Sequence, residues 1–197
     1  MRRIATVLLL LCSATASAAP QGPDFCDSQE MKAAELELVG ETAQDKVSHI
    51  ACKALPNARG QFAVAQYLEQ AGDTGRLDLV LGLVDAQGGI LASATFKDAA
   101  TDDAERFEDA VIDTAPYTLA PGVRAFGVKT SNSTHCTCNN GARSNLSLFV
   151  RKGKSLVRVL EDVQTSEAAY MGEYDSECGG EMNSSATTIA IGGARHN

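Results

Sequence analysis

The segment from Ser131 to Gly141 carries the most distinctive chemistry in this sequence. It contains His135, Cys136 and Cys138, and Cys178 follows later in the chain beside two glycines. One imidazole and three thiolates form a ligand set that suits zinc or copper. A strained Cys136–Cys138 disulfide would instead suit thiol exchange, because strain makes a disulfide easier to reduce. The third interpretation, which we favour, is a structural disulfide that holds down a long polar loop.

The N-terminus favours the structural interpretation, because it indicates the redox compartment. Arg2 and Arg3 precede an apolar run, and Ala16-Ser17-Ala18 matches a cleavage site flanked by small residues. Residues 1–18 are therefore predicted to be a secretory signal peptide. The apolar run is shorter than the roughly 20 residues that a membrane-spanning helix needs. We predict a periplasmic or secreted protein, and disulfides persist in those compartments.

The remaining residues, 19–197, are predicted to form a single β-rich domain that contains five cysteines. Cys26 and Cys52 flank an N-terminal helical region, and we predict that they form a disulfide. Cys178 is expected to pair with Cys136 or Cys138. Because five is odd, one thiol stays free or pairs between molecules. We expect no cofactor on this interpretation, and zinc or copper bound by His135 and these three cysteines is the alternative.

The charge of the chain narrows the class of partner. The formal net charge is −8, and removal of Arg2 and Arg3 with the signal peptide takes it to −10. A chain this acidic repels nucleic acid and anionic lipid surfaces. It suits a basic protein partner or cations, although acidic charge also serves simply to keep a secreted protein soluble.

Period-two apolar spacing predicts the fold class. Leu77, Leu79, Leu81 and Leu83 alternate along one strand, and a loop with two glycines leads to a second strand over Ile90–Phe96. Such a pattern is typical of a β-hairpin. About nine strands at spacings near 8–12 residues predict a mainly β, antiparallel meander. The sequence leaves a sandwich, a barrel and a partial propeller open. Strands that are apolar on both faces are expected at the centre of two layers.

Boundaries of individual elements also follow from the pattern. Residues 24–40 are predicted to be helical early and extended late, with Asp27 or Ser28 as the cap and Gly40 as the end. Residues 41–55 are predicted to form a helix that covers one open side of the sheet. The polar stretches 97–109 and 131–143 are expected to be loops, the first with a short surface helix as an alternative. The last strand is expected at 187–191.

Three segments resemble a group of secreted, uncharacterised proteobacterial proteins. The segments are Cys52-Lys53-Ala54-Leu55-Pro56, the run from Asp113 to Val128 that includes Tyr117-Thr118-Leu119-Ala120-Pro121-Gly122, and Leu146-Ser147-Leu148-Phe149-Val150. The resemblance implies export and a β-rich fold. It implies no activity, so no functional residue follows from it, and Cys136 and Cys138 are not part of the shared pattern.

Common catalytic motifs are absent from the sequence. It contains no His-Glu-x-x-His, Gly-x-Ser-x-Gly or Cys-x-x-Cys, and no phosphate-binding glycine loop. We therefore assign no catalytic residue and expect binding rather than catalysis. The most concrete version is an acidic binder or inhibitor of another envelope or extracellular protein, such as a basic cell-wall hydrolase. The alternative is a metal-binding or thiol-redox protein centred on His135-Cys136-Thr137-Cys138.

Overall fold

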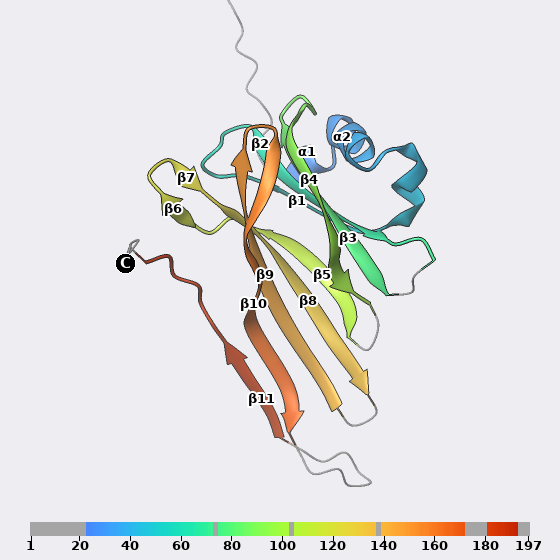
Figure 1. The fold of residues 1–197 in the computed structure, drawn as a ribbon, viewed down its shortest axis with the longest axis vertical. Helices are drawn as coiled ribbons and strands as arrows, with labels where there is room; N and C mark the ends of the chain where they lie inside the picture. Colours follow the sequence, from blue (N-terminus) through green and yellow to red (C-terminus); the bar gives the residue numbers. More distant parts are fainter. Residues whose placement is uncertain (1–22, 73–74, 103–104, 137–138, 172–180, 193–197) are drawn as a thin grey trace, which may run out of the picture.

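The computed structural model describes residues 23–72, 75–102, 105–136, 139–171 and 181–192. Helical elements come first and strands follow (Figure 1). The helical elements are α1 (Pro23–Cys26), α2 (Gln29–Val39) and the 3₁₀ helix η1 (Glu41–Lys46). The strands are β1 (Val47–Ala54), β2 (Gln61–Glu69), β3 (Arg76–Asp85), β4 (Ile90–Thr101), β5 (Arg106–Asp113), β6 (Thr118–Ala120), β7 (Val123–Arg124), β8 (Phe126–Cys136), β9 (Asn139–Lys152), β10 (Ser155–Met171) and β11 (Glu181–Ala186). Within these ranges, no helix is long and apolar enough to cross a bilayer.

The main sheet curls into a nearly closed barrel, which confirms the predicted mainly β, antiparallel fold (Figure 1). Its strands follow the order β1-β2-β3-β4-β10-β9-β8-β5, and β11 pairs with β10. Neighbours are antiparallel except β4 and β10, which run parallel and share one bridge, between Ser93 and Ser155. The two ends of this order meet where Nε2 of His49 in β1 lies 3.0 Å from the carbonyl oxygen of Ala110 in β5.

Both faces of β3 are buried, as the sequence predicts. Leu77, Leu79, Leu81 and Leu83 line the inside of the barrel and are at most 3% exposed. Burial of one such side chain stabilises the fold by roughly 1.5–3 kcal/mol. Strands β2, β8 and β9 add Ala63, Ala65, Tyr67, Phe126, Val128 and Phe149 to this interior. On the outside, Val84 packs with residues of β2 against the helices.

Helix α2 covers the outer face of β2 and β3. Ser28 caps it by accepting a hydrogen bond from the backbone amide of Met31, at 3.1 Å, and Gly40 ends it with φ of 77°. Its buried residues Met31 and Ala34 pack against the sheet, and Leu38 sits over Gly82. A Cβ built on Gly82 would lie 2.6 Å from Leu38 Cδ1, so a larger residue there would force the Leu38 side chain to shift. The predicted Cys26–Cys52 disulfide joins this helical layer to β1.

Two predictions for the N-terminal region are wrong. Residues 41–55 do not form one helix: η1 ends at Lys46, and β1 occupies Val47–Ala54. The apolar spacing there fits both structures, but pairing with β2 and the bond at Cys52 select the strand. The late strand expected within residues 24–40 is helical, because Met31, Ala34 and Leu38 form one stripe at helical spacing.

Three predictions for polar segments are also wrong. Residues 97–109 are strand rather than loop or helix at both ends, since β4 continues to Thr101 past a bulge at Asp98 and β5 begins at Arg106. Residues 131–136 belong to β8 and residues 139–143 belong to β9. The last strand is β11, not residues 187–191, where Ile189 packs against the outer face of the barrel instead. The first two stretches lack alternating apolar residues, so the sequence pattern gives no strand signal there. In residues 187–191, Ile189 and Ile191 do alternate, but the structure assigns no strand to them.

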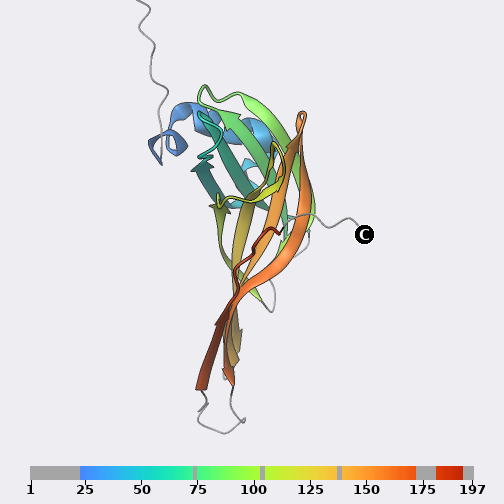
Figure 2. The same ribbon diagram turned by 90° about the vertical axis from the view of Figure 1, so that its left-hand side faces the viewer.

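The extended parts of β8, β9, β10 and β11 form an arm that projects away from the barrel (Figure 2). Several of its cross-strand pairs join small side chains, such as Ser131 with Ser144 and Ala142 with Ala168. An ion pair between Arg143 and Glu105 and a hydrogen bond between Thr134 Oγ1 and the Gly141 amide link neighbouring strands. Backbone pairing, rather than an apolar core, therefore holds the arm together.

Candidate functional site

The residues predicted to carry metal or redox chemistry fall largely outside the described structure. His135 and Cys136 end β8, but their side chains are not described, and Cys138 and Cys178 lie outside the described residues. Among the residues that are described, no group of three or more His, Cys, Asp or Glu side chains is arranged to hold a metal ion. The metal and redox interpretations therefore stay predictions. Cys26 and Cys52 are paired in a disulfide.

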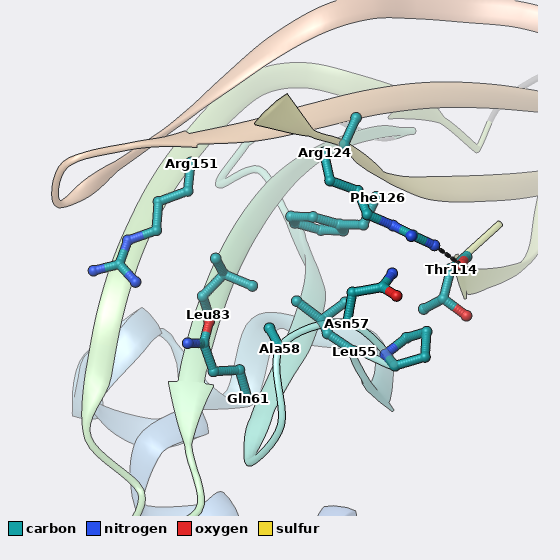
Figure 3. Close-up of a pocket in the computed structure, with 11 residues that line it drawn as sticks. Leu55, Asn57, Ala58, Gln61, Leu83, Thr114, Arg124, Phe126 and Arg151 are labelled. Carbon is teal, nitrogen blue, oxygen red and sulfur yellow. Dashed lines mark hydrogen bonds between the residues drawn. The ribbon is translucent and has the colours of Figure 1, made fainter. Parts of the chain in front are cut away.

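A cavity of about 160 Å³ opens at one end of the barrel, and we call it the mouth cavity (Figure 3). Its floor is apolar and continuous with the barrel interior, because Leu83 and Phe126 belong to both. Leu55 completes the floor from the end of β1. Polar side chains from three different turns surround the opening: Asn57, Gln61, Arg124 and Arg151.

Short turns and strand ends hold these polar side chains in place. Asn57 lies in the β1–β2 turn, which is closed by hydrogen bonds from the Leu55 amide to the Gln61 carbonyl and from the Gln61 amide to the Ala58 carbonyl, both 2.9 Å. Arg124 ends β7, and Arg151 precedes the β9–β10 turn. Figure 3 shows the two arginines on opposite sides of the opening, with Leu83 and Phe126 between them.

The two arginines bind backbone carbonyls rather than carboxylates. Arg151 donates from Nε to Gly153, at 2.8 Å, and from Nη2 to Leu91, at 3.2 Å. Arg124 reaches the carbonyl oxygen of Thr114 at 3.5 Å. Within the described part of the chain, neither guanidinium forms an ion pair. The mouth cavity is therefore lined by two arginines that have no carboxylate partner among the described residues.

A polar network beneath β6 and β7 fixes the position of Arg124. The Tyr117 hydroxyl donates to Asp113 Oδ2 at 2.8 Å, and the Ala125 amide donates to the Tyr117 carbonyl at 2.9 Å. Burial, together with the Asp113 carboxylate, raises the pKa of Tyr117 to about 12. The phenol therefore stays protonated and keeps donating to Asp113 at neutral pH. Because Ala125 follows Arg124 directly, this network sets where the guanidinium enters the cavity.

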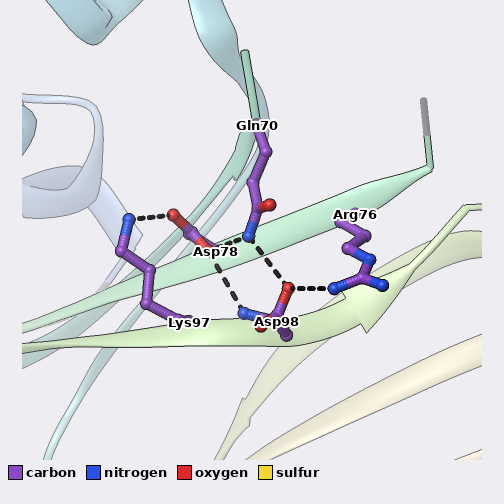
Figure 4. Close-up of polar contacts among 5 residues, drawn as sticks. All are labelled: Gln70, Arg76, Asp78, Lys97 and Asp98. Carbon is purple, nitrogen blue, oxygen red and sulfur yellow. Dashed lines mark hydrogen bonds and ion pairs between the residues drawn. The ribbon is translucent and has the colours of Figure 1, made fainter. Parts of the chain in front are cut away.

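At the opposite end of β3, the cationic side chains are paired with carboxylates (Figure 4). There Arg76 lies 3.2 Å from the Asp98 carboxylate, and Lys97 pairs with Asp78. Burial alone would raise the pKa of Asp78, but hydrogen bonds from Lys97, Gln70 and the Asp98 backbone amide outweigh it and lower the pKa. These cations are neutralised within the fold. They differ in this from Arg124 and Arg151, whose described partners are backbone carbonyls.

Sequence reasoning missed the mouth cavity because its residues come from five separate turns and strands. The sequence treats Arg151 as part of a hairpin turn and Arg124 as a strand residue next to one. The only local signal is a cation between apolar neighbours at Val123-Arg124-Ala125-Phe126. Such a signal also fits an exposed strand residue, and only the closure of the barrel brings the two arginines to the same opening.

Comparison of the chain with protein-family models, curated proteins and solved structures finds no match. The resemblance to secreted proteobacterial proteins therefore stays a prediction.

Proposed function

We propose that this chain is an exported ligand-binding domain whose mouth cavity takes a small organic anion with an apolar body. The observation that carries the proposal is the pair of arginines, Arg124 and Arg151, placed without carboxylate partners over an apolar floor. Arginine is well suited to carboxylates, because its planar guanidinium can donate two parallel hydrogen bonds. The Cys26–Cys52 disulfide supports export to the periplasm or beyond.

The dimensions of the mouth cavity define the ligand further. Its volume of about 160 Å³ is close to the roughly 150 Å³ cavity that accommodates a benzene ring in a protein core. Leu55, Leu83 and Phe126 supply the apolar contacts such a ring needs. The side-chain amides of Asn57 and Gln61 make no hydrogen bond to other described residues, so they can bind polar substituents. A small aromatic or branched aliphatic carboxylate satisfies all of these features.

Benzoate is a direct probe of this proposal. We expect saturable chemical-shift changes at Asn57, Gln61 and Phe126 on titration of ¹⁵N-labelled protein, and none with the neutral isostere benzyl alcohol. Arg124→Gln should weaken benzoate binding about tenfold or more, because a hydrogen bond to a charged group contributes about 1.5–3 kcal/mol. Arg59→Gln is the matched control, since Arg59 lies in the same β1–β2 turn but does not line the cavity.

Two results would contradict the proposal. One is equal affinity for benzoate and benzyl alcohol, which would show that the arginines contribute nothing. The other is equal weakening by Arg124→Gln and Arg59→Gln, which would reduce the effect to the overall charge of the chain.

A second candidate function follows from the acidic helical layer and matches the sequence-based expectation of an acidic partner-binding domain. Helix α2, the residue preceding its cap and η1 expose a run of carboxylates, namely Asp27, Glu30, Glu37, Glu41 and Asp45. Such a surface steers a basic protein and makes association sensitive to salt. A biosensor assay with a basic cell-wall hydrolase such as lysozyme tests it. We expect binding at low salt that Glu37→Lys with Glu41→Lys abolishes, and the absence of binding at low salt would refute it.

A further inference from the structure

A second cavity lies between helix α2, η1 and strands β1 and β2, on the opposite surface of β2 from the barrel interior. We call it the helix groove. Its volume is about 410 Å³, and its polar lining includes Glu35, Gln44, Ser48, His49 and Gln66. This volume falls within the 300–1,000 Å³ that is usual for small-molecule sites. The helix groove shares no residue with the mouth cavity.

Gln66 is the most informative residue of the helix groove. It is 1% exposed, and its Nε2 donates a 3.0 Å hydrogen bond to the backbone carbonyl of Glu35. A carbonyl oxygen can only accept, so this bond fixes which end of the amide is nitrogen. The other end, Oε1, receives no hydrogen bond from any described residue. Because Gln66 lines the groove, Oε1 is an acceptor that a ligand bound there can use.

Other acceptors stand in the same groove. Glu35 is half-buried, and its carboxylate makes no hydrogen bond within the described structure. Burial raises the pKa of Glu35, an effect that the Lys32 ammonium opposes in part. Ser48 donates its hydroxyl proton to the Tyr67 carbonyl at 3.2 Å, so its oxygen lone pairs remain able to accept. Lys32 is the one lysine or arginine of the lining, and it is exposed.

We propose that the helix groove is a second binding site and takes a small organic ammonium ion. A primary ammonium carries three N–H donors, which match Gln66 Oε1, the Glu35 carboxylate and Ser48 Oγ. The apolar part of the ligand would contact Leu36, Val39 and Val47, which also line the groove.

Butylammonium chloride is the probe that tests this site, with butanol and butyrate as neutral and anionic controls. We expect saturable shifts of the Val39, Ser48 and Gln66 signals with butylammonium alone. Glu35→Gln should weaken binding about tenfold or more, because it removes the charged acceptor and keeps its size. Gln66→Met should weaken binding about fivefold, because it removes Oε1 and keeps the side-chain volume.

Glu37→Gln is the matched control, because Glu37 lies on the same helix and is exposed but does not line the groove. It removes the same charge and should leave the affinity within about twofold. Circular dichroism of each variant confirms that the fold is intact. Weakening by Glu37→Gln equal to that by Glu35→Gln would overturn the proposal, and so would unsaturable shifts or equal shifts with butanol.

Discussion

The mouth cavity and the helix groove lie on the same small domain, yet they are built with opposite charge. The mouth cavity is lined by Arg124 and Arg151 together with apolar side chains, whereas the helix groove is lined by Glu35 of α2 and Gln66 of β2. Each site contains polar groups that the described protein leaves without a matching partner. In a chain of net charge −8, uncompensated arginines are more informative than uncompensated acids, because surplus carboxylates are expected everywhere.

The two cavities also differ in what holds them together. The mouth cavity is part of the barrel itself, since Leu83 and Phe126 are core residues. The helix groove exists only while α2 stays on the sheet, and that contact depends on a second apolar cluster and on the Cys26–Cys52 disulfide. Perturbing the helical layer should therefore damage one cavity and spare the other.

Loss of the disulfide should have the largest effect and should separate the cavities most clearly. The bond closes a loop between residues 26 apart in sequence, so the double substitution Cys26→Ser with Cys52→Ser should cost about 3–4 kcal/mol of the free energy of unfolding. Urea denaturation measures this loss. Hydrogen exchange should show that amides of α2 lose protection before those of β3 do. Equal loss of protection in both elements would contradict a separable helical layer.

The next largest effect is expected at the end of β3 that is remote from the mouth cavity. Asp78→Asn should destabilise the protein by about 2 kcal/mol at pH 7, because it removes a charge-assisted hydrogen bond network. The folded pKa of Asp78 lies below its ordinary value, so this stabilisation is present above about pH 4 and is lost as the pH falls through the folded pKa. Urea titrations at a series of pH values from 7 downward should show a difference that shrinks as the carboxylate becomes protonated, and benzoate affinity at pH 7 should not change.

A smaller effect is expected where α2 touches the sheet. Gly82→Ala should cost about 1 kcal/mol, because its Cβ would overlap Leu38 Cδ1 and that flexible side chain must shift. The helix groove should change shape, and butylammonium affinity should fall more than benzoate affinity does. Gly192→Ala is the control, since a Cβ there meets nothing within 4 Å. Calorimetry measures the melting temperature of both variants. A larger decrease for Gly192→Ala than for Gly82→Ala would contradict this prediction.

The smallest effect is a pH dependence that distinguishes the two sites. Burial raises the pKa of Glu35, so butylammonium binding should begin to weaken at a higher pH than an ordinary glutamate would cause, as protonation removes the charge. The charges of Lys32 and Asp27 also act on this carboxyl group, the first lowering and the second raising its pKa. Glu35→Gln should flatten the pH profile measured from pH 7 to pH 5, and an unchanged profile would show that Glu35 is not the source of the pH dependence.

How far the sequence predicts the molecule differs between the barrel and its surroundings. Leu77, Leu79, Leu81 and Leu83 predict their strand correctly, because these four side chains all face the barrel interior and therefore recur at every second residue. The described part of the arm has no buried apolar face, so its sequence shows no apolar alternation. For this reason the sequence predicts a loop over residues 131–143, and this prediction is wrong. In residues 47–54 the apolar spacing fits both a helix and a strand. Pairing with β2 and the disulfide at Cys52 select the strand.

For the candidate sites, too, the sequence predicts contacts between residues of one region but not contacts that depend on the complete fold. Cys26 and Cys52 are predictable as a pair because their chemistry and spacing are local to one region. Arg124 and Arg151 are not, since they meet only when the barrel closes. The residues on either side of Gln66 in β2 are buried. Nothing in the sequence indicates that the Gln66 amide contacts helix α2. The pairing of Cys136, Cys138 and Cys178 stays a prediction that a count of free thiols in denatured protein tests.

One cross-titration tests the central claim most directly: wild type, Arg124→Gln and Glu35→Gln, each titrated by calorimetry with benzoate and with butylammonium. Two independent sites of opposite charge predict a crossed result. Arg124→Gln should weaken benzoate alone about tenfold, and Glu35→Gln should weaken butylammonium alone to the same degree. The account would be contradicted if wild type bound neither ion saturably, or if each substitution weakened both ions equally.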